Sequence, residues 1–563
     1  MTKLSGGEAL AKSLVREGCE VVFGIPGIQI YGLVAGIRDE PGIRMITTRH
    51  EQATTYMADG YARVSGKIGV AMVVPGVGIY NAASGLTTAY SRSSPVLLIA
   101  GQIPREHIGR GLGGIHEVIN QTNVVSTVTK WQYMALTPRE IPYAVSEAFR
   151  QMRTGRPRPT MIEIPPEVAV EREEVQLRDT APISRIVPDH KQLDKAVRAI
   201  TKSDFPLIFA GGGVARSNAE AALVELAEAT NIPVMTSGGG KGVIPDSHPL
   251  CYGSCISPSA EQYEFNQLFE VMQSADLVIG VGSRFALGNP AGESSVLINI
   301  NIDDAELTRI QANTIPLHGD AKATIEALLP LLKEANAGDR PSPAAGVAAA
   351  RKLIAYYDIA EKEPQYPILK MIEDTIPDEA VIVWGVSQFG MYARTHYKVN
   401  HPKTYIDSGY SLNLGYSFPT ALGAKVACPD RPVVCVVGDG GFMFAASELS
   451  TAVKYDINVV TVLFRDDDYG NVSRDLNEFF GGTYETDLHN PDFVSFAESF
   501  GAVGMRAEDP MDLQKLIPKA LELEAPVIID VPITHMQLPR PRLIRHLYSS
   551  PWTTPQEGLI QRT

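Results

Sequence analysis

The sequence predicts an α/β protein of three consecutive doubly wound domains, each built on a mainly parallel sheet. Short apolar runs ending in Gly or Pro alternate with helical stretches along the chain, as in CEVVFGIPG, SPVLLIAGQ and RPVVCVVGDGG. Such runs, without polar alternation, are typical of strands buried on both faces of a parallel sheet. The chain has 563 residues, more than one core usually supports, so several domains are expected.

The alternation falls into three blocks separated by polar or Pro-containing connectors. The first block, residues 1–172, is followed by the charged, aperiodic EREEVQLRDTAPISRIVPDH. The second block, 190–335, is followed by NAGDRPSPAAG, which has the composition of a linker. The third block spans 362–538. The remaining segment, 539–563, contains several Pro and Arg residues and is interpreted as a C-terminal tail or a lid.

Composition and charge exclude several classes of protein. The net charge of −14 argues against nucleic-acid binding, which requires a basic face. No run approaches the roughly 18 apolar residues of a membrane span, and the N-terminus lacks the apolar core of a signal peptide. Five cysteines in so long a chain do not suggest a disulfide framework. We expect a cytoplasmic protein that binds neither nucleic acid nor membrane.

Two groups of acidic residues follow neighbouring apolar runs in the third block. Asp439 lies between glycines after VVCVVG, and the next apolar run leads to Asp466 and Asp468. Parallel strands of a β-α-β unit end at one edge of a sheet, where ligands bind. Mg²⁺ takes such oxygen ligands together with phosphate oxygens, and Gly440 and Gly441 leave backbone N–H groups open to a phosphate. The alternative is that Asp439 caps a helix and the later aspartates form a solvated turn.

This segment resembles the GDG...N diphosphate-binding motif of the thiamine-diphosphate (ThDP) enzymes, the superfamily of acetolactate synthase, pyruvate oxidase and 2-oxoacid decarboxylase. The resemblance covers nearly the whole chain. TTRHEQATTYMADGYARVSGKIGV is similar to their pyrimidine-binding domain, ADLVIGVGSRF and HGDAKATIEALL to their central domain, and YSLNLGYSFPTALGA to their diphosphate-binding domain. It implies the ThDP-binding fold, with these three domains in this order.

The resemblance assigns roles to individual residues. Asp439 and Asp466 become side-chain ligands of Mg²⁺, with Asp466 where the family usually has Asn, and Asp468 offers its backbone carbonyl. Glu51 matches the glutamate that hydrogen-bonds the aminopyrimidine ring and shares a proton with it. Leu414 matches the apolar residue that bends the cofactor. The other expected cofactor-binding residues are Gly385, Val386, Ser387, Gln388, Gly438, Gly440, Gly441, Gly470 and Asn471.

The family's chemistry indicates the reaction. ThDP forms a thiazolium ylid that attacks a carbonyl, usually of a 2-oxo acid, and loss of CO₂ leaves an enamine. We expect a Mg²⁺- and ThDP-dependent carbon-carbon lyase or carboligase similar to acetolactate synthase. Three residues depart from that enzyme: Ile115 and His116 replace Phe and Gln, and Asp475 replaces Trp. His116 is either a catalytic proton donor and acceptor or a structural residue.

The resemblance leaves alternatives open. The central block, with AGGGVARS and GVGSRF, could hold FAD as in acetolactate synthases, or ADP or CoA as in oxalyl-CoA decarboxylase and 2-hydroxyacyl-CoA lyases. A 2-hydroxyacyl-CoA lyase with a basic C-terminal lid is therefore one alternative, and a non-catalytic subunit with the ThDP fold is another. In the family, the pyrimidine-binding domain of one subunit pairs with the diphosphate-binding domain of the next. Glu51 and Asp439 are thus expected to meet across a homodimer or homotetramer interface.

Overall fold

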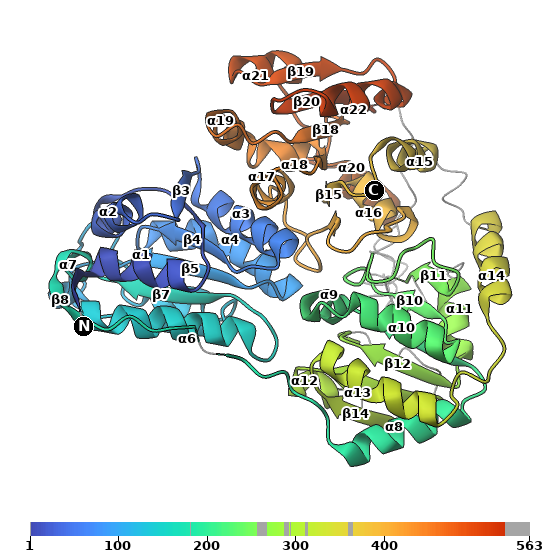
Figure 1. The fold of residues 1–563 in the computed structure, drawn as a ribbon. Coiled ribbons are helices and arrows are strands. Elements are labelled where there is room, and N and C mark those ends of the chain that lie inside the picture. Colours follow the sequence, from blue (N-terminus) through green and yellow to red (C-terminus); the bar gives the residue numbers. More distant parts are fainter. Residues whose placement is uncertain are drawn as a thin grey trace.

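Three six-stranded sheets follow one another along the chain in the computed structural model, each with helices on both faces (Figure 1). The structure describes residues 2–180, 182–255, 267–285, 292, 294–309, 313–357 and 364–534. The predicted α/β class with three domains is confirmed. The predicted tail or lid, 539–563, lies outside the described residues. Among the described helices, none combines the length and the apolar character needed to cross a membrane.

The first domain surrounds the sheet β3-β2-β4-β5-β7-β6, in which neighbouring strands are parallel. Its strands are β2 (Val21–Gly24), β3 (Arg44–Thr47), β4 (Gly69–Val73), β5 (Val96–Gly101), β6 (Trp131–Met134) and β7 (Thr160–Ile164). Its helices are α1 (Gly6–Arg16), α2 (Tyr31–Asp39), α3 (Glu51–Ser65), α4 (Val77–Arg92), α5 (Gln121–Val125), α6 (Ile141–Arg153) and α7 (Pro166–Val170). A separate antiparallel pair joins β1 (Thr2–Ser5) to β8 (Arg172–Val175). β4 and β5 are buried at every residue, which explains their continuous apolar sequence.

The central domain repeats this architecture with the parallel sheet β11-β10-β9-β12-β13-β14. Its strands are β9 (Pro206–Ala210), β10 (Val234–Thr236), β11 (Cys251–Ser254), β12 (Leu277–Val281), β13 (Val296–Asn301) and β14 (Thr314–His318). The helices are α8 (His190–Lys202), α9 (Gly212–Ser217), α10 (Glu220–Thr230), α11 (Gln267–Ser274), α12 (Asp304–Leu307), α13 (Ala321–Glu334) and α14 (Ala344–Tyr357). Asp320 fixes the start of α13 by accepting the Ala323 N–H.

The third domain has the parallel sheet β16-β15-β17-β18-β20-β19. Its strands are β15 (Val381–Trp384), β16 (Tyr405–Ile406), β17 (Val433–Gly438), β18 (Val460–Arg465), β19 (Val503–Arg506) and β20 (Val527–Pro532). Its helices are α15 (Gln365–Thr375), α16 (Gln388–His396), α17 (Ser417–Ala427), α18 (Asp439–Met443), α19 (Leu449–Lys454), α20 (Gly470–Phe480), α21 (Phe493–Ser499) and α22 (Leu513–Leu521). The central strands β17 and β18 lead into the two predicted acidic groups.

Helices α3 and α17 join the first domain to the third (Figure 1). A Cβ atom on Gly60 of α3 would lie 2.1 Å from the carbonyl oxygen of Thr420. Likewise, a Cβ atom on Gly423 of α17 would lie 2.0 Å from the carbonyl oxygen of Met57. Because only glycine permits so close an approach, these two positions let the helices pack backbone to backbone. This contact packs the middle of α3, the helix that begins at Glu51, against the third domain.

Candidate active site

Three neighbouring strands of the third sheet end beside one another and present the predicted cofactor-binding residues. β15 leads to the segment 385–388, β17 to Asp439 and β18 to Asp466. Ser387 begins α16 by accepting the Gly390 N–H at 3.2 Å, and its Cβ lies 3.6 Å from where a Cβ of Gly438 would be. The parallel topology therefore brings these segments together, as the sequence predicted.

Asp439 is a buried carboxylate surrounded by N–H donors. Its Oδ1 accepts the N–H of Gly440 at 2.9 Å. Its Oδ2 accepts the backbone N–H of Asp467 at 2.9 Å and the side-chain amide of Asn490 at 2.7 Å. Only 1% of the residue is exposed, so hydrogen bonds from these donors replace those that the carboxylate would make to water and offset the free-energy cost of burial. The carboxylate is held in one orientation at the end of β17.

Asp466 lies against Asp439 at the end of β18. Its Oδ2 accepts a hydrogen bond of 3.3 Å from Nε2 of Gln388, which connects it to the 385–388 segment. Burial, reinforced by the negative charge of Asp439, raises the pKa of Asp466 to about 8. Burial also raises the pKa of Asp439. Asp439 is buried and Asp466 is partly buried, so the two carboxylates repel each other when both are charged, and a cation beside them would stabilise both.

The chemistry of these donors fits Mg²⁺. Carboxylate and carbonyl oxygens are hard ligands, and Mg²⁺ usually combines one or two carboxylates with phosphate oxygens. Among the described residues, no group of three or more His, Cys, Asp or Glu side chains is arranged to hold a metal ion. The predicted set differs from such a group because it has two carboxylates, of Asp439 and Asp466, and the main-chain carbonyl of Asp468. These ligand roles stay predictions.

The other two aspartates of the run have different surroundings. Asp467 has φ +55°, accepts the side-chain amide of Asn490 at 2.9 Å and pairs with Arg465 at 3.1 Å. The sequence placed Asp467 in solvent or beside a cation, and Arg465 is such a cation. Asp468 forms an isolated antiparallel bridge with Asp487. Within the described part of the chain, Oδ1 of Asp468 is buried without a hydrogen-bond partner.

Glycines and Leu414 shape the space beside Asp439. A Cβ on Gly440 would lie 2.7 Å from the ring of Tyr469, so this position has to be glycine. A Cβ on Gly441 would lie 3.8 Å from Cδ2 of Leu414, which places Leu414 next to the first turn of α18. Gly470 is buried at the start of α20. Because these glycines lack side chains, the backbone at this edge of the sheet could approach a phosphate closely and donate N–H groups to it.

Val386 and Asn471, two further residues predicted to bind the cofactor, lie in different surroundings. Val386 is partly buried and packs against the core shared by the first and third domains. Asn471 accepts a hydrogen bond of 3.0 Å from Arg474, the residue that also pairs with the buried Asp475 at 2.7 Å. The structure therefore places Asn471 in a polar cluster on α20, and its contact with a cofactor stays a prediction.

Glu51 is the first residue of α3. Its Oε2 accepts a hydrogen bond of 3.0 Å from the side-chain amide of Asn81 on α4. His50 caps the same helix, because its Nδ1 accepts the Gln52 N–H at 3.2 Å. A carboxylate at a helix N-terminus is stabilised by the helix dipole, so the plain structural interpretation of Glu51 and the catalytic one are compatible.

His116 lies in a loop of the first domain. Its backbone has φ +62°, and its Nδ1 lies 3.2 Å from Oε1 of Gln29. An amide oxygen can only accept, so Nδ1 carries the proton and Nε2 is left as an acceptor in the neutral ring. The amide of Gln29 also donates to the carbonyl of Ile115 at 2.9 Å. Gln29 thus orients the histidine, and a catalytic role for His116 stays a prediction.

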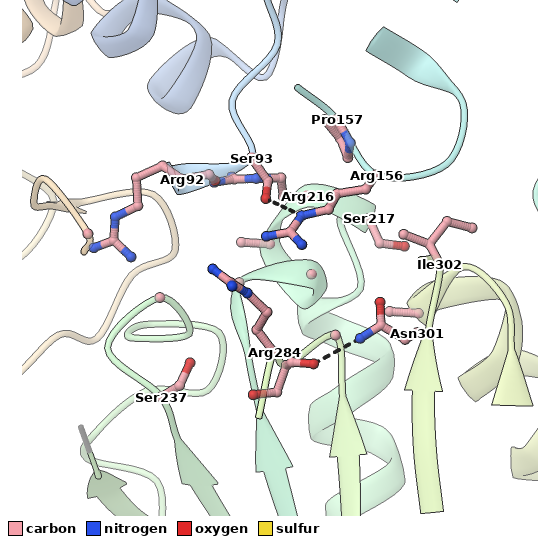
Figure 2. Close-up of a pocket in the computed structure, with 18 of the residues that line it drawn as sticks. Arg92, Ser93, Arg156, Pro157, Arg216, Ser217, Ser237, Arg284, Asn301 and Ile302 are labelled. Carbon is pink, nitrogen blue, oxygen red and sulfur yellow. Dashed lines mark hydrogen bonds between the residues drawn. The ribbon is translucent and has the colours of Figure 1, made fainter. Parts of the chain in front are cut away.

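A cavity of about 490 Å³ lies at the carboxyl ends of the central strands (Figure 2). Both glycine-rich segments of the central domain line it, the first through Gly212 and Gly213 and the second through Ser237, Gly238, Gly239 and Lys241. Residues of the first and third domains complete its wall. The described basic residues that line it are Arg63, Arg92, Arg153, Arg156, Arg216, Lys241, Arg284, Arg394 and Lys403. The described acidic ones are Glu306, Asp320 and Asp407.

The arginines of this cavity lie close to one another, and several pair with acidic residues: Arg156 with Glu306 at 3.0 Å, Arg284 with Glu306 at 3.2 Å and Arg394 with Asp407 at 3.6 Å. Arg92 pairs with Asp407, and Arg216 donates to the carbonyl oxygen of Arg92. Burial, with the neighbouring arginines, lowers the pKa of Arg92 to about 9 and that of Arg216 to about 10. Figure 2 shows Arg92, Arg156 and Arg216 near one another, with Arg156 donating to Ser93 at 2.8 Å. An anion in the cavity would stabilise these cations.

Sequence reasoning missed the polar residues that support the predicted ones. Asn490 contacts Asp439, Asn81 contacts Glu51 and Gln29 contacts His116. Each is distant in sequence from the residue it supports. No motif spacing indicates such partners, because tertiary packing alone sets them.

Comparison with known protein families supports the domain order. The family described as thiamine pyrophosphate enzyme, N-terminal TPP binding domain, matches residues 4–124. The central domain of the same enzymes matches residues 193–328. Their C-terminal TPP binding domain matches residues 385–531. These matches contain the Glu51 region, the glycine-rich segments that line the cavity and the Asp439 region, respectively.

Full-length relatives are similar over most of the chain. A probable acetolactate synthase large subunit of Methanocaldococcus jannaschii is 32% identical, over 94% of this chain and 92% of the relative. The acetolactate synthase large subunit of Haemophilus influenzae is 30% identical over 97% of both chains. A probable 2-ketoarginine decarboxylase of Pseudomonas aeruginosa is 33% identical, over 91% of this chain and 90% of the relative.

Proposed function

The chain belongs to the thiamine pyrophosphate enzymes, and from this we propose that it is a Mg²⁺- and ThDP-dependent carbon-carbon lyase or carboligase acting on a small 2-oxo acid or related carbonyl. One observation carries the proposal: the buried Asp439 and the partly buried Asp466 lie against each other at the ends of adjacent strands, beside glycine-rich backbone. Two adjacent carboxylates shielded from water are unfavourable without a cation, whereas Mg²⁺ and a diphosphate would stabilise them.

Residues of this chain would hold the cofactor from two sides. The carboxylates of Asp439 and Asp466 and the carbonyl of Asp468 would bind Mg²⁺, and backbone at Gly440 and Gly441 would face the diphosphate. ThDP supplies a nucleophilic carbon that accepts the substrate carbonyl. Glu51 would hold a proton at the pyrimidine ring, with its Oε2 oriented by an asparagine of α4.

A homodimer or homotetramer follows from the same proposal, because Glu51 and Asp439 belong to domains that pair across subunits in this family. Large apolar side chains are exposed around both halves of the site. Those of the first domain are Ile28, Tyr31, Val77, Tyr80, Ile115 and Ile119. Those of the third domain are Tyr410, Leu412, Met443 and Phe444. Apolar surface of this kind is typical of an interface with another chain.

The cytoplasmic location stays a prediction.

The relatives support two kinds of reaction. Acetolactate synthases make acetolactate, as their name states, and a carboligation of this kind is the first candidate. The second is decarboxylation of a 2-oxo acid with a cationic side chain, which the Pseudomonas relative's name suggests. Asp475 supports it, because a buried acid on α20 stands where acetolactate synthases carry Trp, and a cationic substrate could compete with Arg474 for its carboxylate. The 2-hydroxyacyl-CoA lyase alternative stays a prediction.

A panel of substrates tests the proposal. Purified protein with ThDP and Mg²⁺ would be incubated with pyruvate, 2-oxobutyrate and a guanidino 2-oxo acid, with and without an acceptor aldehyde. Mass spectrometry would follow CO₂ and the organic product. We expect release of CO₂ from at least one donor, with a ligated product for a carboligase and an aldehyde for a decarboxylase. A CoA thioester cleaved while every 2-oxo acid is untouched would favour the CoA lyase instead.

Asp466→Asn tests the metal ligand that departs from the family. The substitution restores the usual amide and removes one negative charge beside the proposed Mg²⁺. We expect Mg²⁺ affinity to fall about tenfold, since charge on the ligands tunes binding of a hard cation. ThDP should still bind at saturating Mg²⁺, because the amide oxygen remains a ligand. Calorimetric titration of Mg²⁺ in the presence of ThDP measures both. If affinity and turnover are untouched, the placement of Asp466 on the metal is wrong.

We propose that the central cavity holds a nucleotide such as FAD or ADP, through its arginines. Arg216→Met removes one buried cation while preserving most of the side-chain volume. We expect the affinity for the bound nucleotide to fall at least about tenfold, the effect of losing a charged hydrogen bond. Arg38→Met is the matched control, because Arg38 is exposed and pairs with its neighbour Asp39. Titration with ADP and with FAD, together with the visible spectrum of the purified protein, identifies the ligand. Equal affinities in wild type and Arg216→Met would contradict the proposal.

A further inference from the structure

Glu448 is a fully buried carboxylate that no motif predicted. It ends a short 3₁₀ turn, Ala446–Glu448, between α18 and α19. None of the residue is exposed, and burial raises its pKa. Thr451 donates its hydroxyl to Oε2 at 2.6 Å. A group this deeply buried needs further donors to offset the loss of water.

The remaining donors come from the first domain, immediately before Glu51. The backbone N–H of Arg49 lies 3.0 and 3.1 Å from the two carboxylate oxygens of Glu448. The backbone N–H of His50 donates to Oε1 at 3.0 Å. These two amides precede the first turn of α3, where N–H groups lack partners within the helix. A side chain of the third domain therefore fixes the start of the helix that carries Glu51.

Two neighbouring hydrogen bonds strengthen this contact between domains. The hydroxyl of Tyr455 accepts the N–H of Thr47 at 3.0 Å. The side-chain amide of Gln52 donates to the carbonyl of Phe444 at 2.8 Å. Residues 47–52 thus donate hydrogen bonds to residues 444–455 from four positions, the backbone N–H groups of residues 47, 49 and 50 and the side chain of residue 52. In Figure 1 the end of β3 and the start of α3 lie beside α17 to α19.

We propose that Glu448 is a positioning residue for Glu51: its carboxylate holds residues 49 and 50 so that Glu51 points to the cofactor. The inference rests on the proposed function, in which Glu51 meets the pyrimidine ring. Glu448 follows α18, the helix that begins at Asp439. Each chain would thereby link the segment that binds its own diphosphate to the glutamate that serves the partner's cofactor. A 1 Å displacement of a reacting group can cost about 10²-fold in rate, so this orientation matters for catalysis.

The test compares Glu448→Ala with Glu448→Gln. Alanine leaves the amides of residues 49 and 50 without an acceptor, whereas glutamine keeps one oxygen for them. Asp276→Ala is the matched control, because Asp276 accepts the backbone N–H groups of Asp204 and Phe205 in the central domain. Two measurements are made: amide hydrogen exchange of residues 47–54 by mass spectrometry, and turnover at saturating ThDP, Mg²⁺ and substrate.

For Glu448→Ala we expect exchange at residues 47–54 to rise at least about tenfold and turnover to fall at least about tenfold, with KM for the substrate changed less than about twofold. Glu448→Gln should bring both values to within about threefold of wild type, and Asp276→Ala should alter neither. If Glu448→Ala does not fold, Glu448→Asp replaces it, with an expected loss between those of Ala and Gln.

Three results separate the outcomes. Turnover and local exchange unchanged in a folded Glu448→Ala, or exchange raised equally over the whole chain, would overturn the positioning role. Amide exchange needs no substrate, so a local effect in a protein that never binds ThDP would instead defeat the proposed function. Faster exchange confined to 47–54 together with lower turnover supports both.

Discussion

Glu51→Gln is expected to lower turnover by about 10²- to 10⁴-fold, the usual contribution of a positioned proton-transfer group. Glutamine has nearly the same shape and can still accept the hydrogen bond from Asn81, but it cannot share a proton with the pyrimidine ring. The fold should be preserved, since either residue starts α3 acceptably. Steady-state release of CO₂ from the preferred 2-oxo acid measures the loss.

The control for this experiment is Glu20→Gln. Glu20 lies in the same domain and pairs with Lys67 at the surface, away from the start of α3. It should retain turnover within about twofold, as exposed ion pairs contribute little. ThDP affinity of Glu51→Gln should stay within about tenfold of wild type, because in the proposed site the charged contacts would be made mainly at the diphosphate end. An active Glu51→Gln would remove Glu51 from the mechanism.

Asp439→Ala is expected to abolish stabilisation by ThDP with Mg²⁺. In wild type, ligand at a hundred times its Kd should stabilise the fold by about 2.7 kcal/mol. The variant would lose the proposed metal ligand, and it also leaves the N–H groups of Gly440 and Asp467 and the amide of Asn490 without their acceptor. The apo protein should therefore also lose about 1 to 3 kcal/mol for each buried donor left unpaired. Thermal unfolding with and without cofactor separates the two effects.

Asp378→Ala is the matched control for Asp439→Ala. Asp378 is an exposed aspartate of the same domain and bonds the side chain of Asn400. Its unfolding midpoint should rise with ThDP and Mg²⁺ as in wild type. A folded Asp439→Ala that shows the full wild-type rise would mean that the metal and diphosphate bind elsewhere.

The three-domain α/β fold was predictable because its central strands are buried on both faces. β4, β5 and β17 read as continuous apolar runs that end at glycine or polar residues. The joint between the first and third domains was not predictable. The contact depends on Gly60 and Gly423. The need for glycine at these positions is recognised only once α3 and α17 are known to pack backbone to backbone.

The candidate site was predictable to the extent that it follows from strand order. Asp439 and Asp466 had to share one edge of the sheet once their strands were taken as parallel neighbours, and they do. The partners that orient them could not be found in this way. Asn490 and Glu448 lie on loops and turns far along the chain, and a buried polar residue resembles any other until its hydrogen bonds are known.

Calorimetric titration of ThDP into the purified protein, with and without Mg²⁺, tests the central claim most directly. We predict one ThDP per chain in the presence of Mg²⁺, and binding weakened at least about tenfold when Mg²⁺ is removed by a chelator, because Asp439 and Asp466 would hold a cation that neutralises charge on the diphosphate. Absence of ThDP binding under both conditions, or an affinity indifferent to Mg²⁺, would contradict the account.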